Sequence, residues 1–294
     1  MTFDEVFNKH LDFVRKYRAP GTLKYYRKNH ALISKALDGI GYKSTEQIDA
    51  FMFDKLVDYL MTNTDKKNSK INDALSAFRT ALNRQKIELP YQSKLRDDTE
   101  PFIELSEEDT RLLLRYIKSL DLKKSNNLSW ALAILLFLDT GVRLSELLDL
   151  EYRKVDFNNR MILLSHTKNG KKRYTYFGAL SVDLLMEARK HKKPYVMWNY
   201  LKDERLNKRS LEHFFDKINR DLNLTGNERI HPHRLRKTFA MGMLMHGCPV
   251  TTLSVLLGHS DIRQTMNYLR IHSLMAKSDY EKYYPADLNR FYTS

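Results

Sequence analysis

The feature that most constrains the fold is a change of sequence pattern near residue 92. Residues 1–92 carry apolar side chains at helical spacing, broken by turn formers such as Pro20, and show no strand pattern. A polar, proline-containing segment follows, and helix-like and strand-like patterns then alternate. We therefore expect a helical domain over 1–92, a linker over 93–103 and a second, mixed domain over 104–294.

The second domain contains one strong hairpin signal. Asn169-Gly170 separates two strand-like runs within 161–177, and Asn-Gly is the dipeptide most typical of a tight β-hairpin turn. The chain is therefore predicted to be mainly α with a small β-hairpin or sheet, its second domain being α+β. Helices are expected over 3–17, 21–38, 50–62, 68–86, 106–119, 127–139, 181–192, 209–221, 233–246, 250–257 and 261–270, and a short strand over 195–199.

The charge balance indicates a polyanionic partner. The chain has 50 Lys and Arg against 36 Asp and Glu, which gives a formal net charge of +14. Two stretches, 160–173 and 229–260, contain no acidic residue, as expected of a phosphate-facing surface. Nucleic acid is the first candidate and a membrane surface the second. The alternative is a basic soluble protein without such a partner.

Other features point to an intracellular, cytoplasmic protein that does not enter a membrane. Cys248 is the single cysteine, which excludes an internal disulfide framework and a cysteine-rich zinc site. The N-terminus has no apolar segment of signal-peptide type. The longest apolar block, WALAILLFL at 130–138, is far shorter than the ~20 residues of a membrane span and predicts a buried helix.

Several polar residues are candidates for chemistry, although each has an ordinary explanation alone. Arg143 and Glu146 are three residues apart and could form a surface ion pair. Lys168 adjoins the Asn-Gly turn, where lysines commonly solubilise a hairpin. His233 and Arg236 share one helix face and could simply meet water.

The last two candidates lie around a helix boundary. Gly258 is suited to end one helix, so His259 could interact with that helix's C-terminal dipole. On the next helix, the residues Ile262, Met266 and Leu269 would form an apolar stripe. Tyr268 lies off that stripe, nine residues after His259, and could be a half-exposed aromatic.

Three other kinds of site are disfavoured. A metal site at His231, His233, His246 and His259 lacks a His-x-x-x-His pair and an interspersed Glu. There is no Gly-x-Ser-x-Gly elbow of a serine hydrolase. There is no Walker-type phosphate loop, so nucleotide hydrolysis is not expected to power the protein.

Taken together, the candidates match the needs of phosphodiester transfer without metal. Guanidinium groups are always charged and fork onto two phosphate oxygens, so two arginines can stabilise a pentacoordinate phosphorus. A tyrosine hydroxyl can attack phosphorus and form a covalent intermediate. Histidine can move its proton near neutral pH, and lysine can protonate the departing sugar oxygen.

The ordered set of motifs resembles the tyrosine recombinase, or phage integrase, family. The similarity covers about residues 106–275 and is specific because the motifs occur in the family's order. They are the first arginine box, the lysine hairpin, the His-x-x-Arg box and the Leu-Gly-His box with its tyrosine: TGVRLSELLDL, SHTKNGKKR, HPHRLRKTFA and LGHSDIRQTMNY.

The resemblance implies a role for each phosphate-binding residue. Arg143 and Arg236 would clamp the scissile phosphate, and His259 would hydrogen-bond a non-bridging oxygen. Glu146 is similar to the acidic residue often found one turn after the first arginine, and would orient its neighbours. Arg234, between the box residues, is taken as ordinary variation.

The resemblance also assigns the groups that move protons and bonds. Tyr268 would be the nucleophile, Lys168 the general acid on the leaving 5′ oxygen, and His233 an assistant in proton transfer to or from the tyrosine. No cofactor is implied, because the phosphotyrosyl bond preserves the energy of the phosphodiester.

The first 95 residues are similar in size and helix count to the family's helical, SAM-like core-binding domain. The resemblance implies that the two domains close on opposite faces of a duplex, and that four subunits assemble on two DNA sites. Basic positions on the expected second and fourth helices are candidate phosphate contacts: Lys24, Arg27, Lys28, Lys67, Lys70 and Arg79.

Several roles remain open at this point. The two-domain layout resembles Xer-like members, and the expected role is integration and excision of a mobile element. The alternatives are Xer-type resolution of chromosome or plasmid dimers and, less compatible with the compact layout, a type IB topoisomerase. A non-cleaving DNA-binding factor belongs to a different class, and covalent trapping would distinguish it.

Overall fold

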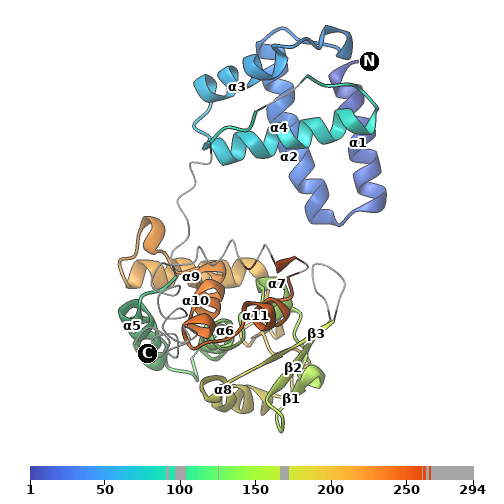
Figure 1. The fold of residues 1–294 in the computed structure, drawn as a ribbon. Helices are drawn as coiled ribbons and strands as arrows, with labels where there is room; N and C mark the ends of the chain where they lie inside the picture. Colours follow the sequence, from blue (N-terminus) through green and yellow to red (C-terminus); the bar gives the residue numbers. More distant parts are fainter. Residues whose placement is uncertain are drawn as a thin grey trace, which may run out of the picture. The chain divides into compact units, whose positions relative to one another are not determined.

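Two units make up the chain, Met1–Pro101 and Phe102–Ser294, each with its own hydrophobic core (Figure 1). Their elements confirm the predicted class, mainly α with small antiparallel sheets. Within the part of the chain that is described, no helix has the length and apolar character needed to cross a membrane. The computed structural model describes residues 1–90, 93–96, 104–124, 126–165, 172–259, 261–262 and 265.

The first two helices of the first unit begin at residues that favour a helix start. Thr2 accepts a hydrogen bond from the Glu5 backbone at 3.2 Å, and the Glu5 carboxylate accepts one from the Thr2 backbone at 2.9 Å. Pro20 opens the next helix, as proline does at a first helical position. The elements are α1 (Phe3–Tyr17), α2 (Pro20–Gly39), the 3₁₀ turn η1 (Thr45–Gln47), α3 (Met52–Asn63) and α4 (Asn68–Arg84).

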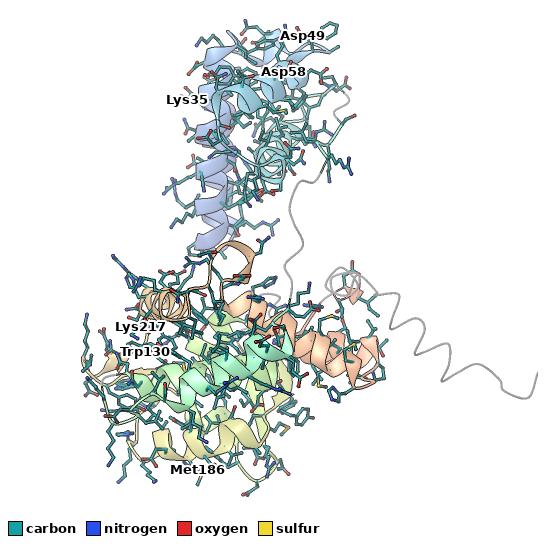
Figure 2. The ribbon with its side chains drawn as sticks, turned by 90° about the vertical axis from the view of Figure 1, so that its left-hand side faces the viewer. Lys35, Asp49, Asp58, Trp130, Met186 and Lys217 are labelled. Carbon is teal, nitrogen blue, oxygen red and sulfur yellow. The ribbon has the colours of Figure 1, made fainter. Side chains whose placement is uncertain are left out.

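Aromatic rings from three helices form the core of this unit. Phe78 on α4 lies 5.6 Å from Phe3, 5.7 Å from Phe7 and 5.9 Å from Phe53, measured between ring centroids. Charged side chains cover the outside, where Lys35, Asp49 and Asp58 lie exposed (Figure 2). The segregation explains why helical periodicity alone predicted these helices to within two residues.

A buried histidine pair joins α1 to α2. His10 Nδ1 and His30 Nε2 are 2.9 Å apart, and the His30 ring stacks on Phe7 at 4.5 Å. Burial, with a smaller contribution from His10, lowers the pKa of His30 to about 4. Burial and then Arg84 also lower the pKa of His10. Both rings are therefore neutral at pH 7.

We expect the first unit to lose stability when the pH falls below 6.5. An unfolded histidine takes up a proton near pH 6.5, whereas folded His30 does so only near 4, so acid favours the unfolded state between these values. The expected loss is about 2 kcal/mol at pH 5. Urea unfolding followed by far-ultraviolet circular dichroism at pH 7 and pH 5 measures it.

Two controls make this measurement specific. His30→Gln should flatten the pH dependence, whereas His213→Gln, at an exposed position of the second unit, should leave it unchanged. Tryptophan fluorescence follows the second unit separately, because both tryptophans, Trp130 and Trp198, lie there. Equal stability of the first unit at the two pH values would contradict the assignment.

The second unit is organised around α6, which is apolar on all sides and therefore buried. It packs against α8 and against α10 (Figure 1), and Trp130 stacks on Phe214 of α9 at 4.7 Å. The helices are α5 (Glu107–Lys118), α6 (Asn127–Thr140), α7 (Leu144–Leu148), α8 (Ala179–Arg189), α9 (Lys208–Asp221), α10 (Pro232–Met245) and α11 (Val250–Leu257), with 3₁₀ turns η2 (Tyr152–Lys154) and η3 (Gly226–Glu228).

Two small antiparallel sheets complete the second unit. The first has the order β1-β2-β3, and the second pairs β4 with β5. The strand expected over 195–199 is shorter, because only its last two residues belong to β4 and Tyr195 forms an isolated bridge. The strands are β1 (Val155–Asp156), β2 (Met161–Leu164), β3 (Arg173–Tyr176), β4 (Trp198–Asn199) and β5 (Glu204–Arg205).

The predicted hairpin is confirmed as β2 and β3, and its register is not the one that a two-residue turn at Asn169-Gly170 would give. Leu164 pairs with Arg173, whereas a two-residue turn at Asn169-Gly170 would pair Leu164 with Thr175. The shift of two residues preserves which side chains face inward. Buried contacts of Arg173, described below, hold this register; Asn169-Gly170 itself lies outside the described residues.

Candidate active site

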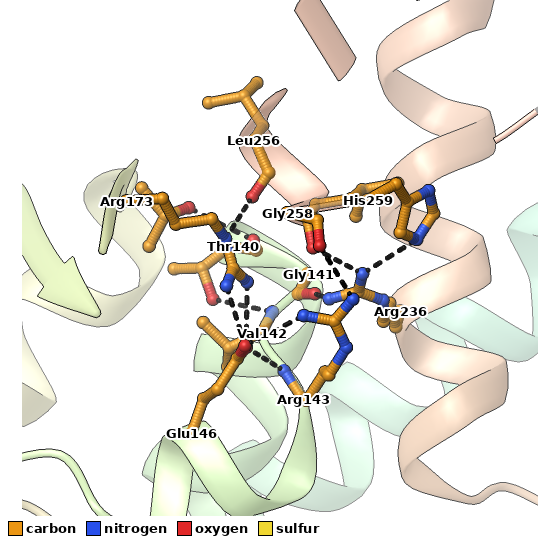
Figure 3. Close-up of polar contacts among 12 residues, drawn as sticks. Thr140, Gly141, Val142, Arg143, Glu146, Arg173, Arg236, Leu256, Gly258 and His259 are labelled. Carbon is orange, nitrogen blue, oxygen red and sulfur yellow. Dashed lines mark hydrogen bonds and ion pairs between the residues drawn. The ribbon is translucent and has the colours of Figure 1, made fainter. Parts of the chain in front are cut away.

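Three arginine side chains from separate elements converge on the C-terminal end of α11 (Figure 3). The last carbonyls of a helix lack partners within the helix and lie at the negative end of its dipole, so they attract cations. Each arginine donates to a different one of them: Arg173 Nε to Leu256 O at 2.9 Å, Arg236 Nη2 to Leu257 O at 2.7 Å and Arg143 Nη2 to Gly258 O at 3.0 Å.

Gly258 is required where α11 ends. Its φ of +65° lies in the left-handed region, as predicted for this C-cap. A Cβ atom at this position would also lie 2.8 Å from Cδ and Nη1 of Arg173. Glycine therefore supplies both the turn and the space that brings Arg173 against the helix end.

Arg143 begins α7 and is held by Glu146, the residue predicted to pair with it. Glu146 accepts from the Arg143 backbone at 2.8 Å and from Nη1 of its guanidinium at 2.9 Å. The alternative of a surface ion pair is wrong, because the Glu146 side chain is only 1% exposed. Burial raises the pKa of Glu146, but Arg173 and Arg143 outweigh it and lower this pKa to about 2. Glu146 is therefore a carboxylate at neutral pH.

Arg173 is a buried component of the site that sequence analysis missed. It was counted in the acid-free stretch 160–173 as part of a phosphate-facing surface, but its side chain is only 6% exposed. Its guanidinium donates two hydrogen bonds to the Glu146 carboxylate, of 2.6 and 2.8 Å. Strand alternation was the available signal, because Arg173 and Thr175 face inward while Tyr174 and Tyr176 face outward.

Arg236 lies buried on α10 and joins α6 to the end of α11. Its Nη1 donates to Gly141 O, and its Nη2 lies 3.1 Å from His259 Nε2. Because arginine can only donate, His259 Nε2 accepts this bond. The imidazole proton then resides on Nδ1, which lies 2.7 Å from the hydroxyl of Thr265.

His259 is neutral in this arrangement. Burial, followed by the charges of Arg236 and Arg143, lowers its pKa to about 4. Thr265 was not predicted to take part, yet it is fully buried, whereas Ile262 is 44% exposed. The predicted apolar stripe is therefore wrong at Ile262, and Thr265 instead is buried in contact with His259. The other stripe residues, Met266 and Leu269, lie outside the described residues.

His233 occupies the first turn of α10, three residues before Arg236. Loss of hydration, then the charges of Arg236 and Lys237, lower the pKa of His233, although the residue as a whole is exposed. His231 has a different role, since its Nδ1 accepts from the Arg234 backbone at 3.3 Å and caps α10. Across the described ranges, no group of three or more His, Cys, Asp or Glu could hold a metal ion.

Lys168 and Tyr268 lie outside the described residues, so their roles stay predictions. The structure brings together the other predicted site residues of the second unit. Arg143, Glu146, Arg236 and His259 are linked by hydrogen bonds through the end of α11. His233 lies close enough to His259 to contribute, as the smallest cause, to lowering the pKa of that histidine.

In the folded chain, acidic residues from other parts of the sequence lie beside the acid-free stretch 229–260. Arg229 pairs with Asp216 at 2.6 Å, and Lys237 with Glu104 at 3.6 Å. Arg234 is buried and pairs with Asp109 at 3.4 Å. Sequence analysis had taken Arg234 as ordinary variation, but its ion pair with Asp109 links α10 to α5. Much of this stretch is therefore compensated by distant carboxylates, which a charge count along the chain cannot detect.

Most predicted DNA contacts of the first unit are exposed. Lys24, Arg27 and Lys28 lie on α2, and Lys67 lies just before α4. None of these four forms an ion pair with another described residue. Lys28 also lines a groove between α2 and α4 together with Lys70. A basic surface over these two helices is therefore available to an anion.

Two predicted contacts are less available. Lys70 pairs with Asp73 at 3.1 Å. Arg79 is half-buried, with its Cζ 5.3 Å from the ring of Phe53. Its Nε and Nη2 are buried and have no hydrogen-bond partner among the described residues. The Arg79 side chain is therefore only partly accessible and packs against Phe53, which weakens its assignment as a phosphate contact.

The site can bind a tetrahedral oxyanion. Arg143 and Arg236 come from different elements, and both guanidinium groups lie next to neutral His259. Three guanidinium groups stand against one carboxylate, so positive charge remains for an anion. Held rigidly by backbone carbonyls, these donors need little rearrangement when charge develops on a bound phosphate.

Comparisons with known proteins agree with this chemistry. The sequence model of the phage integrase family matches residues 104–274. A probable integrase/recombinase of Acholeplasma phage L2 is 32% identical over 275 residues, 91% of this chain and 93% of the relative. Tyrosine recombinase XerC of Lactobacillus leichmannii is 29% identical over 307 residues, 97% of this chain and 99% of the relative.

Solved structures share the fold at low sequence identity. The Tn1549 transposon integrase in complex with transposon right end DNA has a TM-score of 0.78 at 18% identity, covering 96% of this chain and 99% of that chain. A lambda integrase dimer bound to a COC′ core site has a TM-score of 0.71 at 14% identity, covering 91% and 77%. Since the family match spans more than half of the chain and the phage relative aligns with nearly all of it, the chain belongs to the phage integrase family of tyrosine recombinases, enzymes that cut and rejoin DNA.

Proposed function

We propose that the chain is a site-specific recombinase that acts through a 3′-phosphotyrosyl intermediate on Tyr268 and integrates or excises a mobile element. The observation that carries the proposal is the convergence of Arg143 and Arg236 on the end of α11, with His259 hydrogen-bonded to Arg236. This arrangement supports binding of a scissile phosphate by two fixed guanidinium groups.

The proposed first step is cleavage of one strand. The Tyr268 oxygen attacks phosphorus, the bond from phosphorus to the 5′ oxygen breaks, and a 3′-phosphotyrosyl bond forms. Lys168 donates a proton to the leaving 5′ oxygen, and His233 accepts or relays the tyrosine proton. Rejoining is the reverse, with a 5′ hydroxyl of another strand attacking the phosphotyrosyl bond, so the linkage energy is conserved.

His259 adapts to the phosphate. In the DNA-free arrangement its Nε2 accepts from Arg236, so it cannot donate to a phosphate oxygen. A bound phosphate would offset the charges of Arg236 and Arg143 that lower the pKa of His259. Protonation at Nε2 would then allow donation to a non-bridging oxygen, while Thr265 keeps the ring oriented through Nδ1.

Duplex DNA is the proposed partner, and four subunits on two DNA sites the proposed assembly. We assign residues 1–92 to a helical core-type DNA-binding domain, 93–103 to a linker and 104–294 to the catalytic domain. Exposed basic residues on α2 and before α4 support the first assignment. Native mass spectrometry with recombination-site duplexes tests the assembly, and four protomers with two duplexes are expected.

Integration or excision is favoured because the phage relative aligns over 93% of its own length at 32% identity. Dimer resolution is the second candidate, since XerC of Lactobacillus leichmannii aligns over 99% of its length. Sequencing the DNA that flanks the gene separates them. Mobile-element genes with repeated sites at both ends support integration, and a plasmid bearing those ends should then release a circle.

DNA affinity should fall steeply with salt concentration. Lysine and arginine contacts release counterions from phosphates, so log K should fall with log salt at a slope of roughly −0.9 per contact, with 6–10 contacts expected. Fluorescence anisotropy with a labelled duplex measures the slope. Lys24→Gln and Lys28→Gln should each reduce it by about one.

A matched control is available for the salt experiment. Lys190 is exposed on the surface but pairs with Glu187 at 2.5 Å, so Lys190→Gln should leave the slope unchanged. A nearly flat salt dependence of the parent would remove the basis for a phosphate-binding surface. If neither Lys24→Gln nor Lys28→Gln changes the slope, the phosphate-binding surface does not include α2.

A further inference from the structure

The carboxylate of Glu146 is shared by two arginines in different ways (Figure 3). Arg173 approaches with Nη1 and Nη2 in a parallel two-bond arrangement, at 2.6 and 2.8 Å. Arg143 gives Glu146 only one guanidinium nitrogen, at 2.9 Å, and directs Nη2 to Gly258 O. The stronger, bidentate geometry therefore belongs to Arg173.

This division determines how much positive charge Arg143 can offer to a phosphate. With Arg173 present, Glu146 is already neutralised by a partner whose side chain is only 6% exposed. Without Arg173, Arg143 would be the sole cationic partner of Glu146 among the described residues. Its guanidinium would then be compensated by a buried carboxylate, and Arg236 alone would face the phosphate with uncompensated charge.

Arg173 also ties the hairpin to the helix end that carries His259. It is the first residue of β3, and its Nε donates to Leu256 O at 2.9 Å. The close approach at Gly258 allows no Cβ between them. One side chain thus connects three parts of the site: the strand that follows residues 165–172, the end of α11, and the Glu146–Arg143 pair.

We propose that Arg173 is a positioning residue of the strand-transfer reaction, which neutralises Glu146 so that the charge of Arg143 remains available to the scissile phosphate. The inference rests on the proposed function and concerns a residue that does not itself touch DNA. A purely structural ion pair would stabilise the fold equally well, so the test must measure charge at phosphorus rather than activity alone.

A methylphosphonate at the scissile position provides that measurement. Replacing one charged non-bridging oxygen by a neutral methyl group removes the negative charge that Arg143 must stabilise. If Arg173 acts through the charge of Arg143, Arg173→Met should cleave the normal nicked substrate at least about 100-fold more slowly than the parent. On the methylphosphonate, the two proteins should cleave at rates within about threefold, and DNA affinity should be unchanged on both.

Suppression by a second substitution tests the same point. In Glu146→Gln no carboxylate competes for Arg143, so adding Arg173→Met should cost less than about threefold on the normal substrate. This double variant also avoids leaving a buried carboxylate without its main partner. Arg173→Lys keeps the charge but loses the two-bond geometry, and should fall between the parent and Arg173→Met.

Arg205 provides the matched control. It resembles Arg173 in donating Nε to a backbone carbonyl, Leu148 O at 2.8 Å, and in pairing with a carboxylate, Asp149, but it does not contact Arg143 or Glu146. The cleavage rate of Arg205→Met, divided by that of the parent, should be the same on the normal and the methylphosphonate substrate.

The outcomes separate the inference from the proposed function. If the parent forms no covalent complex with any site, the proposed function fails. If the parent cleaves and Arg173→Met cleaves equally fast, the inference alone is overturned. It is also overturned if folded Arg173→Met, or Arg173→Lys should the former not fold, is slowed equally on the normal and methylphosphonate substrates.

Discussion

Replacing Tyr268 by phenylalanine should abolish the covalent protein–DNA complex while leaving DNA affinity unchanged. The hydroxyl is the only proposed nucleophile, and a phenyl ring preserves the shape of the side chain. The parent, given a nicked substrate from which the cleaved fragment diffuses away, should accumulate a denaturant-resistant band in a gel. Tyr268→Phe should give no such band, which amounts to complete loss of strand cleavage.

Neighbouring tyrosines provide the internal controls. Tyr280, Tyr283 and Tyr284 follow in the same C-terminal stretch and, like Tyr268, lie outside the described residues. Their phenylalanine variants should all form the covalent band at the parental rate. If Tyr268→Phe still gives the band and one of these variants does not, the nucleophile is that other tyrosine.

Local signals predicted most of the fold because they act over a few residues. Ser106 is a typical N-cap residue at the start of the helix expected over 106–119, and its hydroxyl accepts from the Asp109 backbone at 3.0 Å. Gly258 was expected to end a helix and ends α11, and Pro232, a residue suited to a first helical position, begins α10. The Arg143–Glu146 pair follows from helical spacing in the same way. Each of these features requires only neighbours in sequence.

The parts that sequence analysis missed depend on residues far apart in the chain. Arg173 meets Glu146 because the fold brings β3 and the start of α7 to the end of α11, and no local pattern carries that information. The same holds for Arg234 and Asp109, which convert an apparently basic stretch into a compensated one. Thr265 was missed because an apolar periodicity concealed a polar contact with His259.

The burial of Glu146 shows that sequence spacing can predict a contact correctly without predicting whether that contact lies at the surface or in the interior. Spacing predicted the contact with Arg143 but allowed a weak surface ion pair as its meaning. The structure instead removes Glu146 from water and gives it two guanidinium partners and a backbone donor. Removing this carboxylate alone would leave the buried Arg173 without its ion-pair partner, so the role of Glu146 is structural and electrostatic at once.

Lys168→Ala should cleave normal DNA about 10²–10⁴-fold more slowly, the usual cost of losing a general acid. The leaving sugar alkoxide is very basic, comparable with hydroxide, whose conjugate acid has a pKa of about 15.7. When sulfur replaces the bridging 5′ oxygen, the leaving group becomes a thiolate with a pKa near 8.5, by analogy with cysteine. It departs without a proton, so Lys168→Ala should cleave this substrate at nearly the parental rate.

Arg143→Ala is the matched control, because its proposed partner is the charge on the non-bridging oxygens, which bridging sulfur leaves in place. It should stay slow on both substrates. Lys171→Ala and Lys172→Ala test the choice of lysine within the hairpin. Counted along the sequence, Lys168 is the lysine nearest the midpoint between Leu164 and Arg173, the last residue of β2 and the first of β3. If Lys168→Ala remains slow with sulfur while Lys171→Ala or Lys172→Ala is rescued, the acid is that other lysine, and the connection must present its C-terminal half to the 5′ oxygen.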